Sequence, residues 1–228
     1  MIRVEKLSKT YGSSIVLDNV NFLIEKGEIA VIYGRNGAGK TTLIKCLSGL
    51  VKPDCGSISL APDNKKKIGL YLGHEMLIGK LKVKEYLFLA GKLHGLSNAE
   101  IESKTSALAQ SLDFGQHLDK MASKISFGTK SKVLFAASVI NDPEILIMDE
   151  PFIGLDLIAI KEVVRVLSDL RKKGCTLFIS SNQVDILENF TDKILILKNQ
   201  TIALERKANI PNSENNGQLS DFILAHLK

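Results

Sequence analysis

The sequence predicts an α/β fold, with a mixed sheet whose core is parallel, an N-terminal antiparallel sheet and a separate helical lobe. Short apolar runs recur along the chain and predict buried strands. Helical patterns fall between several of these runs, and strands that alternate with helices form a parallel sheet covered on both faces. Two segments interrupt the alternation, so we expect them to be additions to the core.

Residues 1–25 form the first added segment. Their apolar residues alternate as in a half-buried strand, and a turn is predicted at Gly12–Ser14. Two strands joined by a short turn pair in antiparallel fashion. The segment is therefore predicted to form a small antiparallel sheet.

Five apolar runs predict the strands of the core. The runs are 28–34, 68–72, 144–150, 176–181 and 193–197. A helix is predicted before the fourth of them, because apolar residues there follow the spacing of one helical face and Gly174 follows as a stop. The residues of this face are Ile160, Val163, Val164, Leu167 and Leu170.

The second added segment is mostly helical and is predicted to form a lobe at about 73–138. Residues 83–110 predict two helices, with Ser97 or Asn98 as the N-cap of the second and Glu100 or Ile101 in its first turn. This lobe lies within the one large domain that we expect over 1–205. Residues 206–228 predict a polar linker and a short amphipathic helix.

The composition is that of a globular protein. A chain of 228 residues is long enough for one large domain or two lobes around one core, and a hydrophobic fraction of 45% argues against a disordered or fibrous class. The net charge of +5 is spread along the chain. Its one dense run, at residues 65–67, is either a solvated loop or a contact for phosphate or lipid headgroups.

Three negative features indicate where the protein works. No apolar stretch approaches the roughly 18–20 residues that cross a bilayer, and the N-terminus lacks the continuous apolar segment of a secretory signal. Cys46, Cys55 and Cys175 are odd in number and far apart, which argues against a disulfide framework or a zinc site. We expect a cytoplasmic protein.

A phosphate-binding loop is predicted by the sequence YGRNGAGKTT at 33–42. An apolar strand runs into the loop and a helical pattern leaves it. Glycines let backbone N–H groups turn toward phosphates, and the helix N-terminus adds partial positive charge. Lys40 is expected to reach the terminal phosphates of a nucleotide, and Thr41 to bind magnesium.

The sequence ILIMDE supplies the second half of a hydrolytic site. An apolar strand that ends in Asp149 brings a carboxylate to the magnesium side of the phosphates. Glu150, the next residue, is expected to polarise an attacking water. Pro151 ends the strand.

These motifs resemble those of the ATP-binding cassette family, the ATPase subunits of ABC transporters, and the resemblance covers most of residues 1–205. It implies a P-loop NTPase fold, ATP and Mg²⁺ as cofactors, and Tyr11 stacked on adenine. Asp149 and Glu150 match the Walker B pair, and Asp156 ends the D-loop that crosses between subunits. The remaining residues expected to bind the nucleotide are the Walker A residues Gly34, Asn36, Gly37, Ala38, Gly39, Lys40, Thr41 and Thr42, with Ser126 and Gly128 of the signature.

The signature at 125–132 departs from the family pattern. Phe127 replaces its first glycine, whereas Ser126 and Gly128, which would meet the γ-phosphate bound to the opposite subunit, are kept. We expect this segment still to cap ATP. A short single cassette with this signature resembles exporter ATPases.

Two further departures affect catalysis. His74 and Glu75 stand where the Q-loop usually has a glutamine, so Glu75 is the candidate magnesium ligand there. Asn182 stands where the family usually has its switch histidine; an amide can hydrogen-bond a phosphate but cannot shuttle a proton. We therefore expect Glu150 and Asn182 as catalytic residues of an ATPase with slow turnover.

The resemblance implies that the protein binds and hydrolyses ATP, closes as a homodimer or heterodimer, and drives transport through separate membrane-spanning permease subunits at the cytoplasmic face of the cell membrane. Nucleic acid is not an expected partner. Two alternatives remain: a soluble ABC ATPase outside transport, and a regulatory cassette that binds ATP with little hydrolysis. The transported substrate, and import against export, are properties of the partner that this sequence does not encode.

Overall fold

The structure, a computed structural model, describes residues 1–61, 67–73, 76–182, 190–207 and 226. The chain falls into two compact units. The first comprises Met1–Asp63, Ile147–Asp149 and Thr176–Lys228, and the second comprises Asn64–Leu146 and Glu150–Cys175. His74 and Glu75 lie outside the described residues, as does the predicted C-terminal helix apart from residue 226, which is helical.

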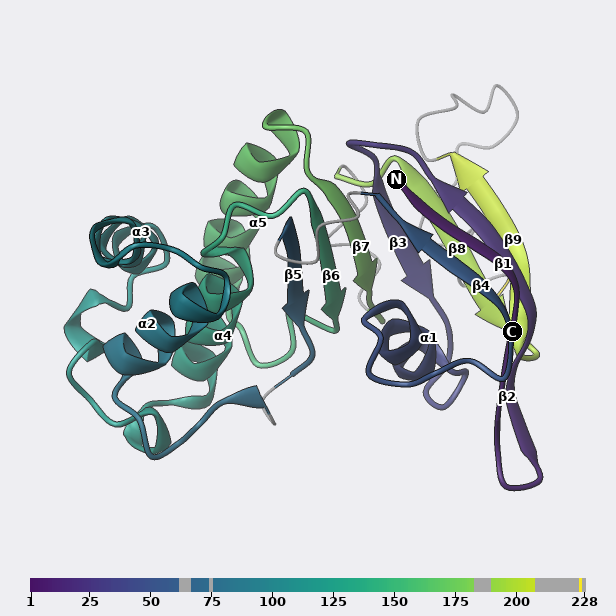
Figure 1. Ribbon diagram of the computed structural model, residues 1–228, viewed down its shortest axis with the longest axis horizontal. Coiled ribbons are helices and arrows are strands. Elements are labelled where there is room, and N and C mark those ends of the chain that lie inside the picture. The colour runs from purple at the N-terminus through teal and green to yellow at the C-terminus, as the bar shows by residue number, and fades with distance from the viewer. Residues whose placement is uncertain (62–66, 74–75, 183–189, 208–225, 227–228) are drawn as a thin grey trace. The chain divides into compact units, whose positions relative to one another are not determined.

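A three-stranded antiparallel sheet opens the first unit (Figure 1). It consists of β1 (Ile2–Tyr11), β2 (Ser14–Ile24) and β4 (Cys55–Leu60), in the order β2-β1-β4. The predicted pairing of the first two strands is confirmed, with Ile2 opposite Ile24 and Tyr11 opposite Ser14. The third strand, which pairs with the other edge of β1, was not predicted.

Parallel strands form the core of the first unit. They are β3 (Ile29–Tyr33), β7 (Thr176–Ser180) and β8 (Lys193–Lys198), and β3 lies between the other two. Every residue of β3 and β7 is buried, which explains their continuous apolar sequences. The helix α1 (Lys40–Leu47) follows β3, and β9 (Thr201–Lys207) pairs antiparallel with β8.

The complete second sheet has the strand order β5-β6-β7-β3-β8-β9. Its first two strands are β5 (Ile68–Tyr71) and β6 (Ile145–Asp149). All five predicted core strands are thus confirmed. Strand β6 belongs to both units, because Ile145 and Leu146 fall in the second and the last three residues in the first.

The second unit contains six helices of the described residues (Figure 1). They are α2 (Val83–Leu93), α3 (Asn98–Ser111), η3 (Gly115–His117), η4 (Ala122–Lys124), α4 (Phe127–Val139) and α5 (Leu157–Lys172). The two predicted helices of the lobe are confirmed. Ser97 is the N-cap of α3, and Glu100 completes a reciprocal capping box with it.

Helix α5 is longer than predicted and buries a narrower stripe. Its N-cap is Asp156, whose carboxylate accepts a hydrogen bond of 2.8 Å from the backbone N–H of Ala159. The buried residues recur at four, four and three positions, whereas Ile160 and Val164 are only half-buried at the margins. This spacing keeps one face inward over the whole helix. The buried stripe is Ala159, Val163, Leu167 and Leu170.

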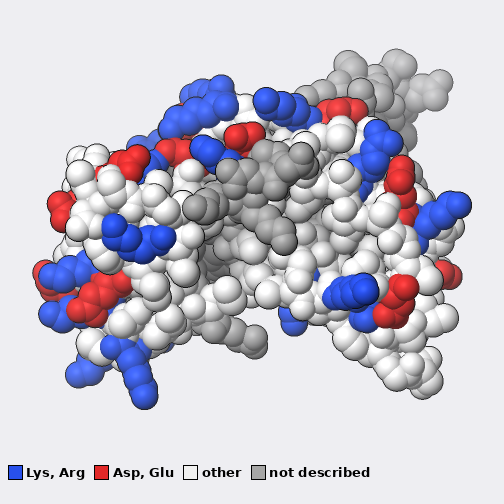
Figure 2. All heavy atoms as spheres, viewed as in Figure 1, with Lys and Arg blue, Asp and Glu red and all other residues white. Residues whose placement is uncertain are grey.

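Surface features agree with the composition. Basic and acidic side chains are interspersed on the face shown in Figure 2. Within the described part of the chain, every helix is too short or too polar to traverse a bilayer.

Candidate functional site

The loop between β3 and α1 needs glycine at three positions for steric reasons. Gly37 and Gly39 have φ angles of 82° and 107°, in the left-handed region. A Cβ atom on Gly39 would also lie 2.9 Å from the backbone oxygen of Val16, and one on Gly34 would lie 2.8 Å from that of Leu197. The loop therefore packs directly on β2 and β8. Its conformation requires glycine at positions 34, 37 and 39.

Lys40, the first residue of α1, is buried, with 6% of its surface exposed. Its ammonium donates to the backbone oxygen of Gly34 at 2.7 Å and to Oδ1 of Asn182 at 2.8 Å. Burial of a cation is costly unless oxygen atoms surround it. The loop thus holds a positive charge at the place where the sequence predicts terminal phosphates.

Asn182 connects Asn36, within this loop, to Lys40 at the start of α1. Its Oδ1 accepts from Lys40, and its Nδ2 donates to Oδ1 of Asn36 at 2.8 Å. An ammonium has no acceptor, so the contact with Lys40 fixes which end of the amide is oxygen. The structure therefore brings together three predicted site residues that are as far as 146 positions apart in the sequence.

The start of α1 has the properties of an anion site. The first N–H groups of a helix have no partner within the helix, and the helix dipole places partial positive charge there. Thr41 and Thr42 lie in this first turn, and neither is buried. The turn before it is closed by a bond of 3.0 Å from the N–H of Ala38 to the oxygen of Arg35. Together with Lys40, this end of the helix suits a polyphosphate.

Asp149 ends β6, and its carboxylate is oriented by a neighbouring strand. Ser180, at the end of β7, donates a hydrogen bond of 2.5 Å to Oδ1 of Asp149. Thr41 and Asp149 offer a hydroxyl and a carboxylate, which are the hard oxygen ligands that Mg²⁺ prefers. These residues fit the cofactor that the sequence predicts.

Glu150 follows Asp149 directly in the chain but has a left-handed backbone, with φ of 48°. For a residue with a Cβ atom this conformation is strained and is found mainly where the surroundings enforce it. It redirects the chain at the carboxyl end of β6, where the sequence predicts the catalytic carboxylate.

In the second unit, Ser126 and Gly128 lie at the start of α4. Ser126 is the N-cap, and its hydroxyl accepts from the N–H of Thr129 at 3.2 Å. Phe127, between them, is half-exposed, and its ring lies against Gly154. A Cβ atom on Gly154 would lie only 2.1 Å from Cε1 of that ring. Phe127, which replaces the first glycine of the signature, thus packs against the predicted D-loop.

Tyr11 ends β1 and is 47% exposed. Lys9 lies over its ring at 5.4 Å, and the Lys9 ammonium pairs with Asp54 at 2.6 Å. Asp54 also accepts from the N–H of Thr10 at 2.7 Å, and these hydrogen bonds lower the pKa of its carboxyl. The end of β1 is therefore fixed by Asp54, and Tyr11 remains about half exposed beside it.

Sequence reasoning missed Ser180 and Asp54. Ser180 carried one signal, its position at the end of a buried strand beside the predicted Asn182. Asp54 is recognised only by its contacts with Lys9 and Thr10, far along the chain. Glu75, the predicted ligand in the Q-loop, lies outside the described residues.

Comparison with known proteins gives the family. A family profile described as ABC transporter matches residues 17–153. The chain is 34% identical over 197 residues to an ABC transporter ATP-binding protein of Methanocaldococcus jannaschii, covering 86% of this chain and 74% of that protein. It is 32% identical over 212 residues to the lantibiotic transport ATP-binding protein SrtF of Streptococcus pyogenes, covering 91% of each.

Solved structures show the same fold. The structure of an ATP-binding subunit of an ABC transporter superposes with a TM-score of 0.85 at 29% identity, covering 91% of this chain and 90% of that one. A dimeric ATP-binding cassette in a post-hydrolysis state has a TM-score of 0.84 at 24% identity, covering 92% and 100%. The matched profile and the two relatives agree with the loop geometry: this chain belongs to the ABC transporter family, as an ATP-binding subunit.

Proposed function

We propose that the chain binds MgATP in the loop 34–42, hydrolyses it slowly, and uses closure of two cassettes to drive a separate permease. The observation that carries the proposal is the buried Lys40 ammonium at the positive end of α1, held by oxygens of Gly34 and Asn182. Phosphate oxygens are stronger partners for a cation than a neutral amide oxygen. ATP therefore replaces Asn182 as the partner of Lys40 or joins it.

Residues of the first unit would hold the cofactors. Thr41 and Asp149 are the proposed magnesium ligands, and Mg²⁺ would neutralise charge that develops on the phosphates. Ser180 keeps the carboxylate of Asp149 in place. Tyr11 would stack on adenine, with its strand end held by Asp54.

Glu150 is the proposed catalytic residue that polarises the attacking water, since it follows the magnesium carboxylate directly. Asn182 would orient Lys40 and Asn36 rather than move a proton, because its amide does not titrate and already bonds to both. These two hydrogen bonds of Asn182 support the expectation of slow turnover.

The second nucleotide-binding subunit would contribute Ser126 and Gly128 to ATP held by the first. The half-exposed ring of Phe127 and the exposed Ile153, Leu157 and Ile158 support an interface on this part of the second unit. One relative of the same fold is described as a dimer bound to ADP and Pi. We propose the same arrangement here, as a homodimer or with a homologous subunit.

A permease would dock on the helical lobe. The second unit has an apolar cavity of about 340 Å³ whose walls include Leu72 and Met76, on either side of positions 74–75. Met76 and Leu93 at this cavity are 48% and 74% exposed, which suits an apolar segment of a membrane protein. The protein would then work at the cytoplasmic face of the cell membrane.

Steady-state phosphate release by the purified chain tests this function, with Glu150→Gln as the blank. Slow release above the blank supports the proposal, and release equal to the blank identifies a regulatory cassette that binds ATP without hydrolysis. Co-purification with a polytopic membrane protein separates a transporter subunit from an ABC ATPase that acts outside transport.

A further inference from the structure

The segment between β6 and α5 begins with Glu150 and is folded back on itself. The N–H of Ile153 donates to the backbone oxygen of Glu150 at 3.4 Å. The N–H of Leu155 donates to the backbone oxygen of Phe152 at 3.2 Å, and the side chain of Phe152 is buried. Gly154, between these bonds, has a left-handed φ of 76°. The position of Glu150 therefore depends on what holds this turn at Gly154.

The start of α4 packs against the turn at two points. A Cβ atom on Gly154 would overlap Cδ1 and Cε1 of Phe127, so the edge of the ring lies in van der Waals contact with this glycine. A Cβ atom on Gly128 would lie 3.2 Å from the backbone oxygen of Gly154. The helix start is itself fixed, because Ser126 caps it and its hydroxyl oxygen lies 2.8 Å from that of Thr129. All of these residues belong to the second unit.

The ring of Phe127 contributes little to the core of its own helix. Its side chain is half-exposed, and the buried residues of α4 begin one turn later, at Ser131. The hydroxyl of Ser131 donates to the backbone oxygen of Phe127 at 3.3 Å, a bond that does not involve the ring. A substitution at this position can therefore release the turn without unfolding the helix.

We propose that Phe127 is a positioning residue for Glu150 of its own chain. The ring packs on Gly154, and the hydrogen bonds of the turn pass this restraint to the carboxylate that polarises water. Glycine at position 127 would lack the contact, whereas the expected capping of ATP uses only Ser126 and Gly128. The inference rests on the proposed function, because it assigns Phe127 to the hydrolytic step of the same site.

Hydrogen exchange followed by NMR tests the contact itself, in the full chain without nucleotide. We expect Phe127→Ala to speed exchange of the amides of Ile153 and Leu155 about fivefold, because a turn with fewer packing contacts opens more often. Phe127→Tyr keeps the ring and should exchange as the parent does. Unchanged exchange in Phe127→Ala overturns the proposal.

Steady-state phosphate release tests the consequence for catalysis, at protein concentrations where the rate per chain is constant. Phe127→Ala should lower kcat about tenfold, less than the 10²- to 10⁴-fold typical of a lost general base, and should change KM for MgATP less than about twofold. Phe127→Tyr should keep the parental kcat. An unchanged kcat in Phe127→Ala overturns the proposal. A deficit that disappears at higher protein concentration also overturns it, because the ring would then act only by holding two chains together.

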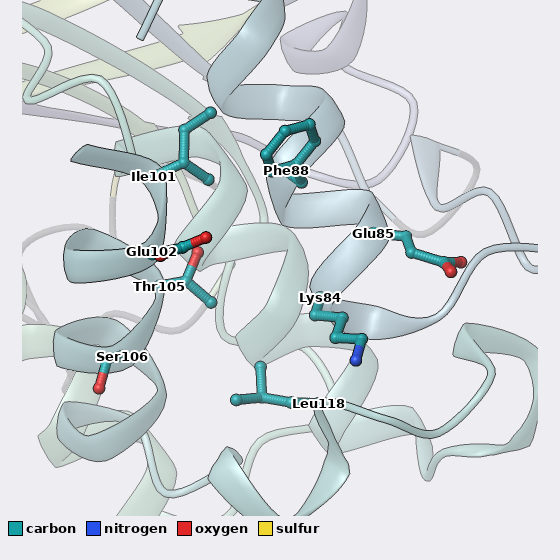
Figure 3. Close-up of a pocket in the computed structure, with 8 residues that line it drawn as sticks. All are labelled: Lys84, Glu85, Phe88, Ile101, Glu102, Thr105, Ser106 and Leu118. Atoms are coloured by element: carbon teal, nitrogen blue, oxygen red, sulfur yellow. The ribbon is translucent and has the colours of Figure 1, made fainter. Parts of the chain in front are cut away.

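Phe88→Ala is the matched control, because it removes another exposed ring from the second unit. The ring of Phe88 lies on α2, where it lines a cavity with Ile101 and Leu118 (Figure 3). The variant should leave the exchange of the turn and kcat as in the parent. An equal loss of kcat in Phe88→Ala would overturn the proposal, since a general loosening of the unit would then explain both results.

Failure of this inference is distinct from failure of the proposed function. A parent chain that binds MgATP and releases no phosphate contradicts the proposed hydrolysis, and the exchange of Ile153 and Leu155 still decides whether the ring holds the turn. A parent chain that hydrolyses ATP, with exchange and kcat unchanged in Phe127→Ala, refutes only the role of the ring.

Discussion

Lys40 is the side chain on which we expect nucleotide binding to depend most directly, because its buried ammonium lies at the start of α1. We expect Lys40→Ala to weaken ATP binding by roughly 10- to 150-fold, the loss that corresponds to about 1.5–3 kcal/mol for a hydrogen bond to a charged group. Calorimetric titration with MgATP measures this change.

Lys45→Ala is the matched control for Lys40→Ala, since Lys45 is an exposed residue in the last turn of the same helix. It should bind ATP as the parent does. Equal affinity in the Lys40 variant would show that the loop does not hold the phosphates.

Asn182 is the residue that we propose limits the turnover of the site. We expect Asn182→His to raise steady-state phosphate release by about tenfold, because a neutral imidazole keeps an acceptor for Lys40 and can also carry a proton; general acid–base groups contribute about 10²- to 10⁴-fold at most. Asn182→Ala, which loses both bonds, should slow release. An unchanged rate in the histidine variant would mean that Asn182 already performs the role or that another step limits the reaction.

At the residue scale, the sequence allowed prediction of side chains that belong to a local pattern. Lys40, Thr41 and Asp149 stand next to glycines or at the end of an apolar strand, so their chemistry is evident within a few positions. The bond from Asn182 to Lys40 joins residues 142 positions apart, and the bond from Ser180 to Asp149 joins residues 31 apart. Such contacts depend on the order of strands in the sheet, which no local pattern encodes.

At the scale of elements, Phe127 at the start of α4 and Gly154 before α5 form one packed unit. We expect Gly154→Ala to lower the thermal midpoint, because φ of 76° strains any residue with a Cβ atom by about 1–3 kcal/mol and the ring of Phe127 occupies the space. Differential scanning fluorimetry measures the midpoint.

The double variant Phe127→Ala with Gly154→Ala separates the two causes. Without the ring, Gly154→Ala should lower the thermal midpoint only through backbone strain, so the drop relative to Phe127→Ala alone should be smaller than the drop in the parent. If Gly154→Ala lowers the midpoint equally in the parent and in Phe127→Ala, the contact between the ring and Gly154 does not exist in solution.

The reactivity of the cysteines measures whether solvent and reagents can enter the core around α1 and β7. Cys46 on α1 and Cys175 before β7 are buried, and burial raises the pKa of both thiols, that of Cys175 to about 12. Because the thiolate is the reactive form, neither should react with Ellman's reagent between about pH 7 and pH 9. The exposed Cys55 should react alone. Rapid modification of a second thiol in the folded protein would contradict this core, and Cys55→Ser should abolish the fast phase.

Elements with a continuous apolar run, an alternating pattern or a capped helical pattern could be predicted, and the mostly exposed strand β4 could not. Strands β3, β7 and β8 are wholly or largely buried, so their sequences are unambiguous. Strand β4 is mostly exposed or half-buried, with the sequence CGSISL. Strand β4 forms because β1 lies next to it, and its own sequence carries little strand signal.

At the scale of the whole molecule, the proposed function requires more than one chain. Ser126 and Gly128 are proposed to cap ATP bound by another cassette, and a separate permease is the proposed membrane partner. Fold and family could be predicted from the motifs of this chain. The substrate could not, because the transport path is expected to lie in the proposed permease.

Sedimentation velocity of Glu150→Gln in MgATP tests most directly the claim that two cassettes close on ATP. The variant keeps Asp149 and Lys40, so it should bind ATP and, without hydrolysis, accumulate as a closed dimer that disperses when ATP is removed. Glu150→Gln combined with Lys40→Ala should stay monomeric. A Glu150→Gln variant that is saturated with ATP and remains a monomer would contradict closure between two copies of this chain.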